Sequence, residues 1–280
     1  MTKPNLCVNG RLLSLEKPAV MAILNATPDS FFGGSRQNTL EQALAAASQM
    51  LKDGALILDV GGYSTRPNAA DVSPTEEIDR VCPLIEGILK QNPEAIVSVD
   101  TFRAATAEAA IRAGAHLIND VSGGEIDPDI WQVAAKYQCP YVLMHSRGTP
   151  QTMMQLTDYK HLVADIFDYF TQKIQALRAQ GVHELILDLG FGFAKTEVQN
   201  YELMREMAVF QSFKLPILVG ISRKSMIYKP LKLTADQALN GTTSLHMLCM
   251  ERGANILRVH DVREAVQSIQ LRELFWNKSL

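Results

Sequence analysis

Eight short apolar segments recur along the chain, and longer helix-like stretches separate them. They are Val20–Asn25, Ala55–Asp59, Ala95–Asp100, Ala115–Asn119, Pro140–His145, Glu184–Asp188, Pro216–Ser222 and Ala254–His260. Strands that alternate with helices form parallel sheets with right-handed crossovers. Eight such units in 280 residues predict a closed (β/α)8 barrel rather than an open doubly wound sheet. Barrels of this kind use about 250 residues as one domain, so we expect a single domain over residues 1–280.

Glycine and proline mark the ends of several predicted helices. Four stretches each stop at a glycine, which favours a helix C-terminus: Leu40–Asp53, Ala104–Ala113, Thr157–Gln180 and Thr234–Arg252. A fifth, Thr75–Gln91, follows an N-cap serine and a first-turn proline. Near the N-terminus, Asn9 and Gly10 form a turn pair that predicts a small hairpin closing the barrel floor.

Composition and charge disfavour several classes of protein. The chain is 47% hydrophobic, carries a formal net charge of -3 and has no long basic block, which disfavours nucleic-acid binding. No apolar run approaches the roughly 20 residues of a membrane span, and the N-terminus leads into no signal-peptide segment. The four cysteines are scattered, which fits a reducing cytoplasm. The six histidines show no zinc-ligand spacing.

Nearly every predicted strand ends in a polar residue. These residues are Asn25, Asp59, Asp100, Asn119 with Asp120, His145, Asp188, Ser222, and Arg258 with His260. Asp and Asn also start turns, and this alone could explain any one of them. Strand ends of a barrel converge on one mouth, however, so eight polar ends together favour an enzyme with its site there.

The carboxylates among them suit a planar nitrogen heterocycle. Asp59, Asp100 and Asp188 could each accept paired hydrogen bonds from a guanidine-like edge. Asn119 can both donate and accept, and Lys224 can donate to a ring oxygen or nitrogen. The alternative for each aspartate is an ion pair with a nearby Lys or Arg, such as Arg66 or Arg258.

The last two strands predict an anion site. Arg258 and His260 end the eighth strand and Ser222 ends the seventh, where barrels frequently bind phosphate. His260 could instead be a core histidine, and Ser222–Ser225 a solvated connection. Two polar loops, 25–35 and 61–67, resemble lids, and Gly190–Phe193 would let the backbone approach a ligand.

With these residues assembled, the chain resembles the dihydropteroate synthase family over nearly its whole length. The matching motifs, in order, are Asn25–Phe31, Asp59–Pro67, Ser98–Thr101, Ile118–Gly124, Met144–Pro150, Asp188–Phe193, Gly220–Ser225 and Arg258–Val262. The resemblance implies a transferase of folate biosynthesis. It would join (7,8-dihydropterin-6-yl)methyl diphosphate to 4-aminobenzoate, giving 7,8-dihydropteroate and diphosphate.

The resemblance also implies roles for individual residues, including a catalytic set of Thr65, Arg66, Asp100 and Lys224. The implied pterin contacts are Asp100, Asn119, Asp188 and Lys224, and Asp59, Met144 and Phe193 complete the substrate-binding set. Thr65, Arg258 and His260 would contact the diphosphate, and Asn25 would ligate its Mg2+. Thr65, Arg66 and Ser222 would place the aminobenzoate.

Two rivals and some departures accompany this resemblance. The rivals are a methyltetrahydrofolate methyltransferase domain and a catalytically silent pterin-binding paralogue. The departures from the family's common pattern are Gly33, Tyr63, Ser146, Leu189 and Ala194. None of these positions belongs to the implied ligand set. The family also implies a homodimer.

Overall fold

The computed structural model describes residues 4–26, 36–63, 72–149 and 151–276. Eight parallel strands close a barrel in the order β10-β3-β4-β5-β6-β7-β8-β9. Their bounds are β3 Ala19–Asn25, β4 Ile57–Gly61, β5 Ile96–Asp100, β6 Leu117–Asp120, β7 Tyr141–Met144, β8 Leu185–Asp188, β9 Ile217–Val219 and β10 Ile256–Val259. The predicted (β/α)8 barrel is confirmed, and each strand lies within about two residues of its predicted segment or inside it.

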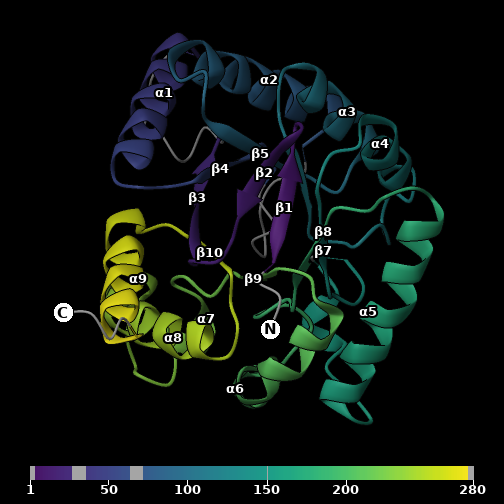
Figure 1. The fold of residues 1–280 in the computed structure, drawn as a ribbon, viewed down its shortest axis with the longest axis vertical. Helices are drawn as coiled ribbons and strands as arrows, with labels where there is room; N and C mark the ends of the chain where they lie inside the picture. The colour runs from purple at the N-terminus through teal and green to yellow at the C-terminus, as the bar shows by residue number, and fades with distance from the viewer. Residues whose placement is uncertain (1–3, 27–35, 64–71, 150, 277–280) are drawn as a thin grey trace.

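Helices surround the barrel and cover its outer face (Figure 1). They are α1 Arg36–Lys52, α2 Pro74–Gln91, α3 Ala104–Arg112, α4 Ile130–Tyr137, α5 Leu162–Ala179, α6 Glu197–Glu206, α7 Ser225–Tyr228, α8 Leu239–Glu251 and α9 Val262–Trp276. Short 3-10 turns lie at η2 Met153–Gln155, η3 Met207–Phe213 and η4 Ala235–Gln237. Ser73 caps α2 as predicted, since its side chain accepts the Glu76 N–H. None of the described helices is long and apolar enough to cross a membrane.

Two predicted helices have different limits in the structure. The stretch predicted as Thr157–Gln180 becomes helical only at Leu162, and the Asp165 carboxylate in its first turn accepts the N–H groups of Lys160 and His161 that precede the helix. The stretch predicted as Thr234–Arg252 is broken. Thr234 and Gln237 close a capping box around η4, and α8 begins after it. Helices α4, α6, α7 and α9 lie outside the five predicted helical stretches.

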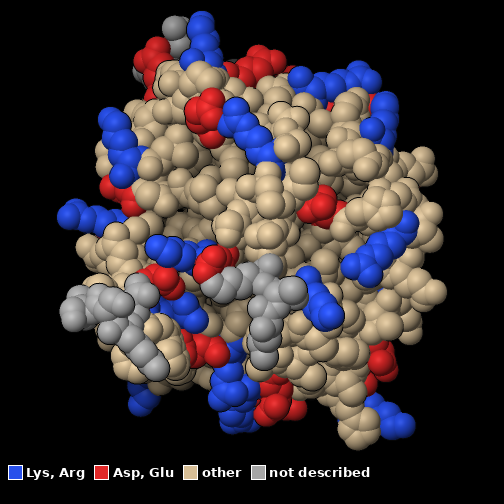
Figure 2. Space-filling model, viewed as in Figure 1, with Lys and Arg blue, Asp and Glu red and all other residues tan. Residues whose placement is uncertain are grey.

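The predicted hairpin closes one end of the barrel. Strands β1 (Asn5–Val8) and β2 (Arg11–Ser14) pair in antiparallel fashion around Asn9 and Gly10, which both have positive φ. Figure 1 shows the pair in purple across the barrel. Leu6, Val8 and Leu15 pack against inward residues near the strands' amino ends. Charges of both signs are interspersed over this face (Figure 2).

Strand alternation divides the buried side chains into two sets. One apolar set fills the lower barrel: Met21, Ile57, Leu117, Val142, Ile186, Leu218 and Ile256. The residues adjacent to these, such as Leu58, Ile118 and Leu187, face outward and pack under the helices. Because side chains alternate with a period of two, residues two positions beyond the lower set point inward at the mouth.

Candidate active site

Most strands carry a polar side chain at an inward position two or four residues beyond their apolar floor residue. By this alternation Asp59, Asp100, Asn119 and Asp188 face the barrel interior at the carboxyl ends of β4, β5, β6 and β8. Asp59 has 0% of its surface exposed and Asn119 2%, so water does not solvate them freely. The predicted convergence of these four side chains on one mouth is therefore seen in the structure.

Two of the polar strand ends do not face the mouth, contrary to the sequence-based expectation. Asp120 directly follows Asn119 and so points outward, where it accepts hydrogen bonds from Tyr141 and from the N–H groups of Ser122 and Gly124. His145 follows Met144 and packs edge-on against Tyr169 outside the barrel. Both positions stabilise loops rather than the interior of the mouth.

Arg258 ties two of the inward carboxylates together. Its Nε lies 2.6 Å from Asp59 Oδ2, and its Nη2 lies 2.5 Å from Asp100 Oδ2. Asn119 Nδ2 donates to the same Asp59 oxygen at 2.9 Å. The other Asp59 oxygen, Oδ1, is buried and has no hydrogen-bond partner among the described residues. The ion pairing that the sequence left open as an alternative for the aspartates thus occurs inside the candidate site.

Burial shifts the proton affinities of the charged groups in the mouth. Burial raises the pKa of Asp100 to about 7, although Arg258 opposes the shift. It also raises the pKa of Asp188, against Lys224. Burial lowers the pKa of Lys224 to about 8, and Asp188 limits that fall. Burial disfavours the charge on Arg258 too, but Asp59 and Asp100 outweigh it and raise the guanidinium pKa.

A glycine-containing turn after β8 supports Lys224. Lys224 Nζ donates to the Phe191 carbonyl at 2.5 Å and lies 4.4 Å from the centre of the Phe193 ring. A side chain at Gly192 would press on the stem of Lys224, where a Cβ would lie 3.0 Å from its Cδ. The glycine therefore lets Lys224 extend across the turn toward the mouth.

Comparison with known proteins agrees with this geometry. The family model described as "Pterin binding enzyme" matches residues 21–260. The dihydropteroate synthase of Synechocystis is 42% identical over 260 residues, covering 92% of this chain and 90% of the relative. That of Escherichia coli K12 is 41% identical over 270 residues, covering 96% and 95%. The chain belongs to the dihydropteroate synthase family. It is a transferase, and its predicted place in folate biosynthesis is confirmed.

Solved structures of this family superpose on the whole fold. A Yersinia pestis dihydropteroate synthase in complex with a sulfonamide drug gives a TM-score of 0.90 at 42% identity, covering 97% of this chain and 98% of that one. A Xanthomonas albilineans dihydropteroate synthase with 4-aminobenzoic acid gives 0.91 at 36% identity, covering 98% of both chains. The same Xanthomonas enzyme has been solved with 7,8-dihydropteroate.

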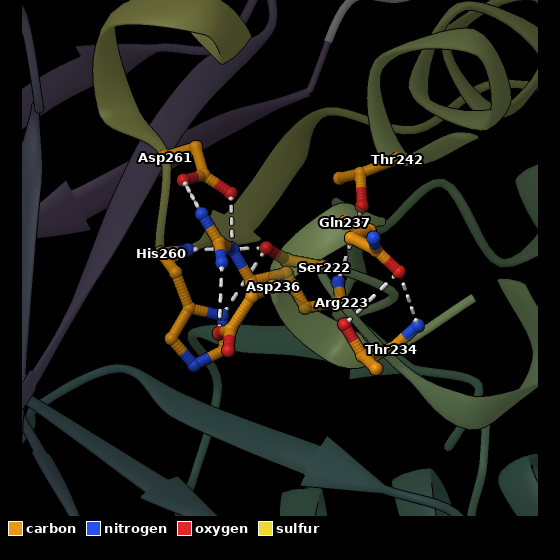
Figure 3. Close-up of polar contacts among 8 residues, drawn as sticks. All are labelled: Ser222, Arg223, Thr234, Asp236, Gln237, Thr242, His260 and Asp261. Atoms are coloured by element: carbon orange, nitrogen blue, oxygen red, sulfur yellow. Dashed lines mark hydrogen bonds and ion pairs between the residues drawn. The ribbon is translucent and has the colours of Figure 1, made fainter. Parts of the chain in front are cut away.

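Ser222 and His260 form a second polar group at the mouth, in addition to the inward carboxylates. Ser222 Oγ accepts the His260 N–H at 3.2 Å and lies 3.2 Å from His260 Nδ1 (Figure 3). Arg223 turns away and forms a two-bond pair with Asp261 at 2.9 and 2.6 Å. Arg223 has a φ of +56° and lies between Ser222 and Lys224 in the sequence. The backbone turns at this residue, so the side chains of Ser222 and Lys224 point in different directions.

Some of the remaining predicted site residues lie within the described part of the chain, and others lie outside it. Asn25 is the last residue of β3, and its side chain lies close to Gly61. A Cβ placed on Gly61 would be 3.8 Å from Asn25 Oδ1. Met144 is buried at the end of β7, and Phe193 is partly buried beside Lys224. Thr65 and Arg66 lie outside the described residues, as do most of the two predicted lid loops.

Lys195 was not predicted from the sequence, yet it is 1% exposed in the same turn as Phe193. Its Nζ lies 3.0 Å from His145 Nδ1 and from the Gly190 carbonyl, and 3.1 Å from the Phe193 carbonyl. Burial lowers its pKa to about 7. The one signal in the sequence was a lysine two residues after the Gly190–Phe193 run. Its neighbour Ala194, a departure from the family pattern, has a φ of +48°.

Proposed function

We propose that the mouth of this barrel condenses (7,8-dihydropterin-6-yl)methyl diphosphate with 4-aminobenzoate, and that the residues assigned from the sequence divide the work. The observation that carries these assignments is the convergence of buried carboxylates, one amide and two cations on one end of the barrel. A desolvated cluster of this kind suits a polar heterocycle better than water.

The pterin is assigned to the inward carboxylates and Lys224. Asp59 Oδ1 is buried without a partner, so a ring N–H or amino group would satisfy it. Asn119 uses its Nδ2 on Asp59, which leaves its oxygen to accept from the ligand. Asp188 uses Oδ1 on the Gly190 N–H, which leaves Oδ2 for the heterocycle. Lys224 supplies a donor, and Met144 and Phe193 provide apolar contact.

The reaction needs stabilisation of positive charge in the pterin. As the C–O bond to the diphosphate breaks, charge spreads from the methylene carbon into the ring. The ionised forms of Asp100 and Asp188, which Arg258 and Lys224 favour against the effect of burial, stabilise that charge electrostatically. The aromatic amine then attacks the methylene carbon. No covalent bond to the enzyme is required.

The leaving diphosphate is assigned to the last strand and to Asn25. Arg258 uses Nε and Nη2 on the carboxylates, so Nη1 is the nitrogen assigned to the diphosphate, together with His260. The described residues contain no cluster of three His, Cys, Asp or Glu that could cage a metal. A single amide oxygen such as Asn25 Oδ1 fits Mg2+, which usually keeps waters and substrate phosphates as ligands. When bound, Mg2+ would neutralise charge on the diphosphate.

The aminobenzoate is assigned to Thr65, Arg66 and Ser222. Ser222 lies on the opposite side of Arg223 from Lys224, at the rim. If Arg66 binds the aminobenzoate carboxylate, Arg66→Ala should raise the KM for aminobenzoate more than that for the pterin diphosphate.

Oligomeric state and location are further proposals. Large apolar side chains are exposed on α8 and α9, which pack side by side: Leu248, Leu271, Leu274, Phe275 and Trp276. A second copy of the chain would cover them, which supports a homodimer. The four unpaired cysteines favour the cytoplasm. We assign all of these properties to one domain spanning residues 1–280.

A diphosphate-release assay with both substrates and Mg2+ tests the proposal. We expect diphosphate and 7,8-dihydropteroate in equal amounts, and no release when aminobenzoate is omitted. Retained pterin binding without turnover would instead favour the catalytically silent paralogue.

A further inference from the structure

The turn between β8 and α6 is held from beneath by one buried lysine. Lys195 Nζ faces three acceptors: the Gly190 carbonyl, the Phe193 carbonyl and His145 Nδ1. The protonated form, which prevails below the lowered pKa of about 7, has three N–H donors, so the three contacts match its full capacity. Burial lowers the pKa of His145 well below its ordinary value, which keeps the ring neutral and lets Nδ1 accept. The charge of the nearby Asp188 favours the protonated form of Lys195 against the effect of burial.

The backbone of this turn has little freedom to move elsewhere. Asp188 Oδ1 accepts the Gly190 N–H, and Asn200 Oδ1 accepts the Gly192 N–H at 2.7 Å. A Cβ at Gly190 would overlap the His145 carbonyl, so the turn lies directly against the end of β7. The two ends of the turn are joined by the Phe193 N–H, which donates to the Gly190 carbonyl at 3.0 Å, and by Lys195, which donates to the carbonyls of both Gly190 and Phe193.

The upper side of the same turn contacts Lys224. The Phe191 carbonyl accepts from Lys224 Nζ, and the Phe193 ring lies under it. The carbonyls of residues 190 and 193 point to Lys195, whereas that of residue 191 points to Lys224. The turn therefore connects two lysines, one buried below it and one facing the mouth.

We propose that Lys195 is a positioning residue for the pterin site: its ammonium fixes the 190–193 turn in the shape that holds Lys224 over the mouth. This inference rests on the proposed assignment of Lys224 to the pterin. Without the ammonium, the Gly190 and Phe193 carbonyls lose their shared donor. The remaining bonds of the turn then hold the Phe191 carbonyl and the Phe193 ring less firmly under Lys224.

A double-mutant cycle on pterin diphosphate binding tests it. Calorimetry would compare Lys195→Met, Lys224→Met and the double variant, with Lys195→Gln as a milder change should Lys195→Met fail to fold. We expect Lys195→Met to weaken binding roughly 10- to 100-fold, as positioning residues around a site do. In the Lys224→Met background the same change should matter less than about 2-fold. Additive effects would contradict the inference.

A spectroscopic readout separates positioning from a general loss of stability. With 13C-labelled lysine, the Lys224 Cε signal is the one missing in Lys224→Met. It should shift in Lys195→Met or Lys195→Gln, and an unmoved signal would overturn the inference. The control is His116→Leu, which removes the acceptor of the Val97 N–H at the opposite end of the barrel. It should lower Tm and leave both the signal and pterin binding unchanged.

The two proposals can fail separately. Unchanged pterin affinity in Lys224→Met would contradict the assignment of Lys224 to the pterin. The Lys195 inference would then be decided by the Lys224 Cε signal alone, which reports the geometry of the turn without any ligand.

Discussion

The two ends of this barrel are built from the same strands with opposite chemistry. At the floor, inward positions carry Met21, Ile57, Val142 and Ile186, and the β1–β2 hairpin seals them from water. At the mouth, inward positions of β4, β5, β6 and β8 carry three carboxylates and one amide, and Arg258 pairs with two of the carboxylates, Asp59 and Asp100. The fold thus separates the layer that contributes stability from the layer available for chemistry.

This separation explains why the fold remains stable with buried charged groups at the mouth. Buried carboxylates are costly unless they are paired, and removing one partner leaves an uncompensated charge. Arg258 pairs two of them, and the floor supplies apolar burial that does not depend on them. Substitutions at the two ends should therefore change different measured properties.

The largest effect should come from Asp100→Asn at the mouth. Its carboxylate is assigned to the cation that forms in the pterin, so kcat should fall roughly 10²- to 10³-fold, the usual loss for a preorganised electrostatic group. Initial rates of diphosphate release measure kcat. Tm should change little, because the amide oxygen can still accept from Arg258. A large fall in Tm with unchanged kcat would assign Asp100 to the structural layer.

Ile186→Ala at the floor should show the opposite behaviour. It removes a fully buried side chain from the lower barrel and should destabilise the fold by about 2–5 kcal/mol. Urea unfolding gives the free energy, and diphosphate release from the folded fraction gives kcat. We expect kcat close to that of the unchanged enzyme. A strong loss of kcat in folded protein would mean that the floor shapes the mouth.

The pH dependence of the mouth should be smaller but specific. The pKa of Asp100 is raised in the folded state, to about 7, so its carboxylate is increasingly protonated below that pH. Because the ionised form stabilises the cation, kcat/KM for the pterin diphosphate should fall as pH drops through about 7. Asp188 shifts in the same direction and can add a second proton.

The same shift has the opposite sign for stability. The folded state binds the Asp100 proton more tightly than the unfolded chain, so this group's contribution to stability decreases as pH rises from about 4 to about 7. Urea unfolding at several pH values, compared with Asp100→Asn, isolates it. A difference between the two proteins that does not depend on pH would contradict the raised pKa.

The smallest predicted effect concerns Ala194, beside the buried lysine. Its φ of +48° is strained for any residue with a Cβ. Ala194→Gly should therefore stabilise the fold by up to about 1 kcal/mol, partly offset by the greater freedom of glycine in the unfolded chain. Urea unfolding measures it, with kcat unchanged. Destabilisation would show that the Ala194 side chain contributes packing that exceeds the strain.

Much of the fold followed from periodicity. Strand segments alternating with helices gave the barrel, Asn9 and Gly10 gave the hairpin, and Ser73 gave the start of α2. The inward direction of a strand's last residues could not be read in the same way. Asn119 and Asp120 are adjacent and equally polar, and a shift of one residue reverses which side chain enters the mouth.

Ion pairing of the aspartates was open from the sequence, but which carboxylates Arg258 would join could not be predicted. Arg258 contacts Asp59 across 199 residues of sequence, and neither residue's neighbourhood identifies the other. Lys195 lies in a motif whose phenylalanines and glycines drew attention to the ligand side of the turn. Its partners, His145 and two backbone carbonyls, come together only when β7 and β8 are adjacent.

Pterin diphosphate binding by two variants, measured side by side, tests the separation of floor and mouth most directly. Calorimetry on Lys224→Ala should show affinity weakened at least about 10-fold with little change in Tm, as expected when a charged donor to the ligand is lost. Ile186→Ala should show a lower Tm and an affinity within about 2-fold of the unchanged enzyme. Full pterin affinity in Lys224→Ala, or a loss of affinity in Ile186→Ala as large as that expected of Lys224→Ala, would contradict the account.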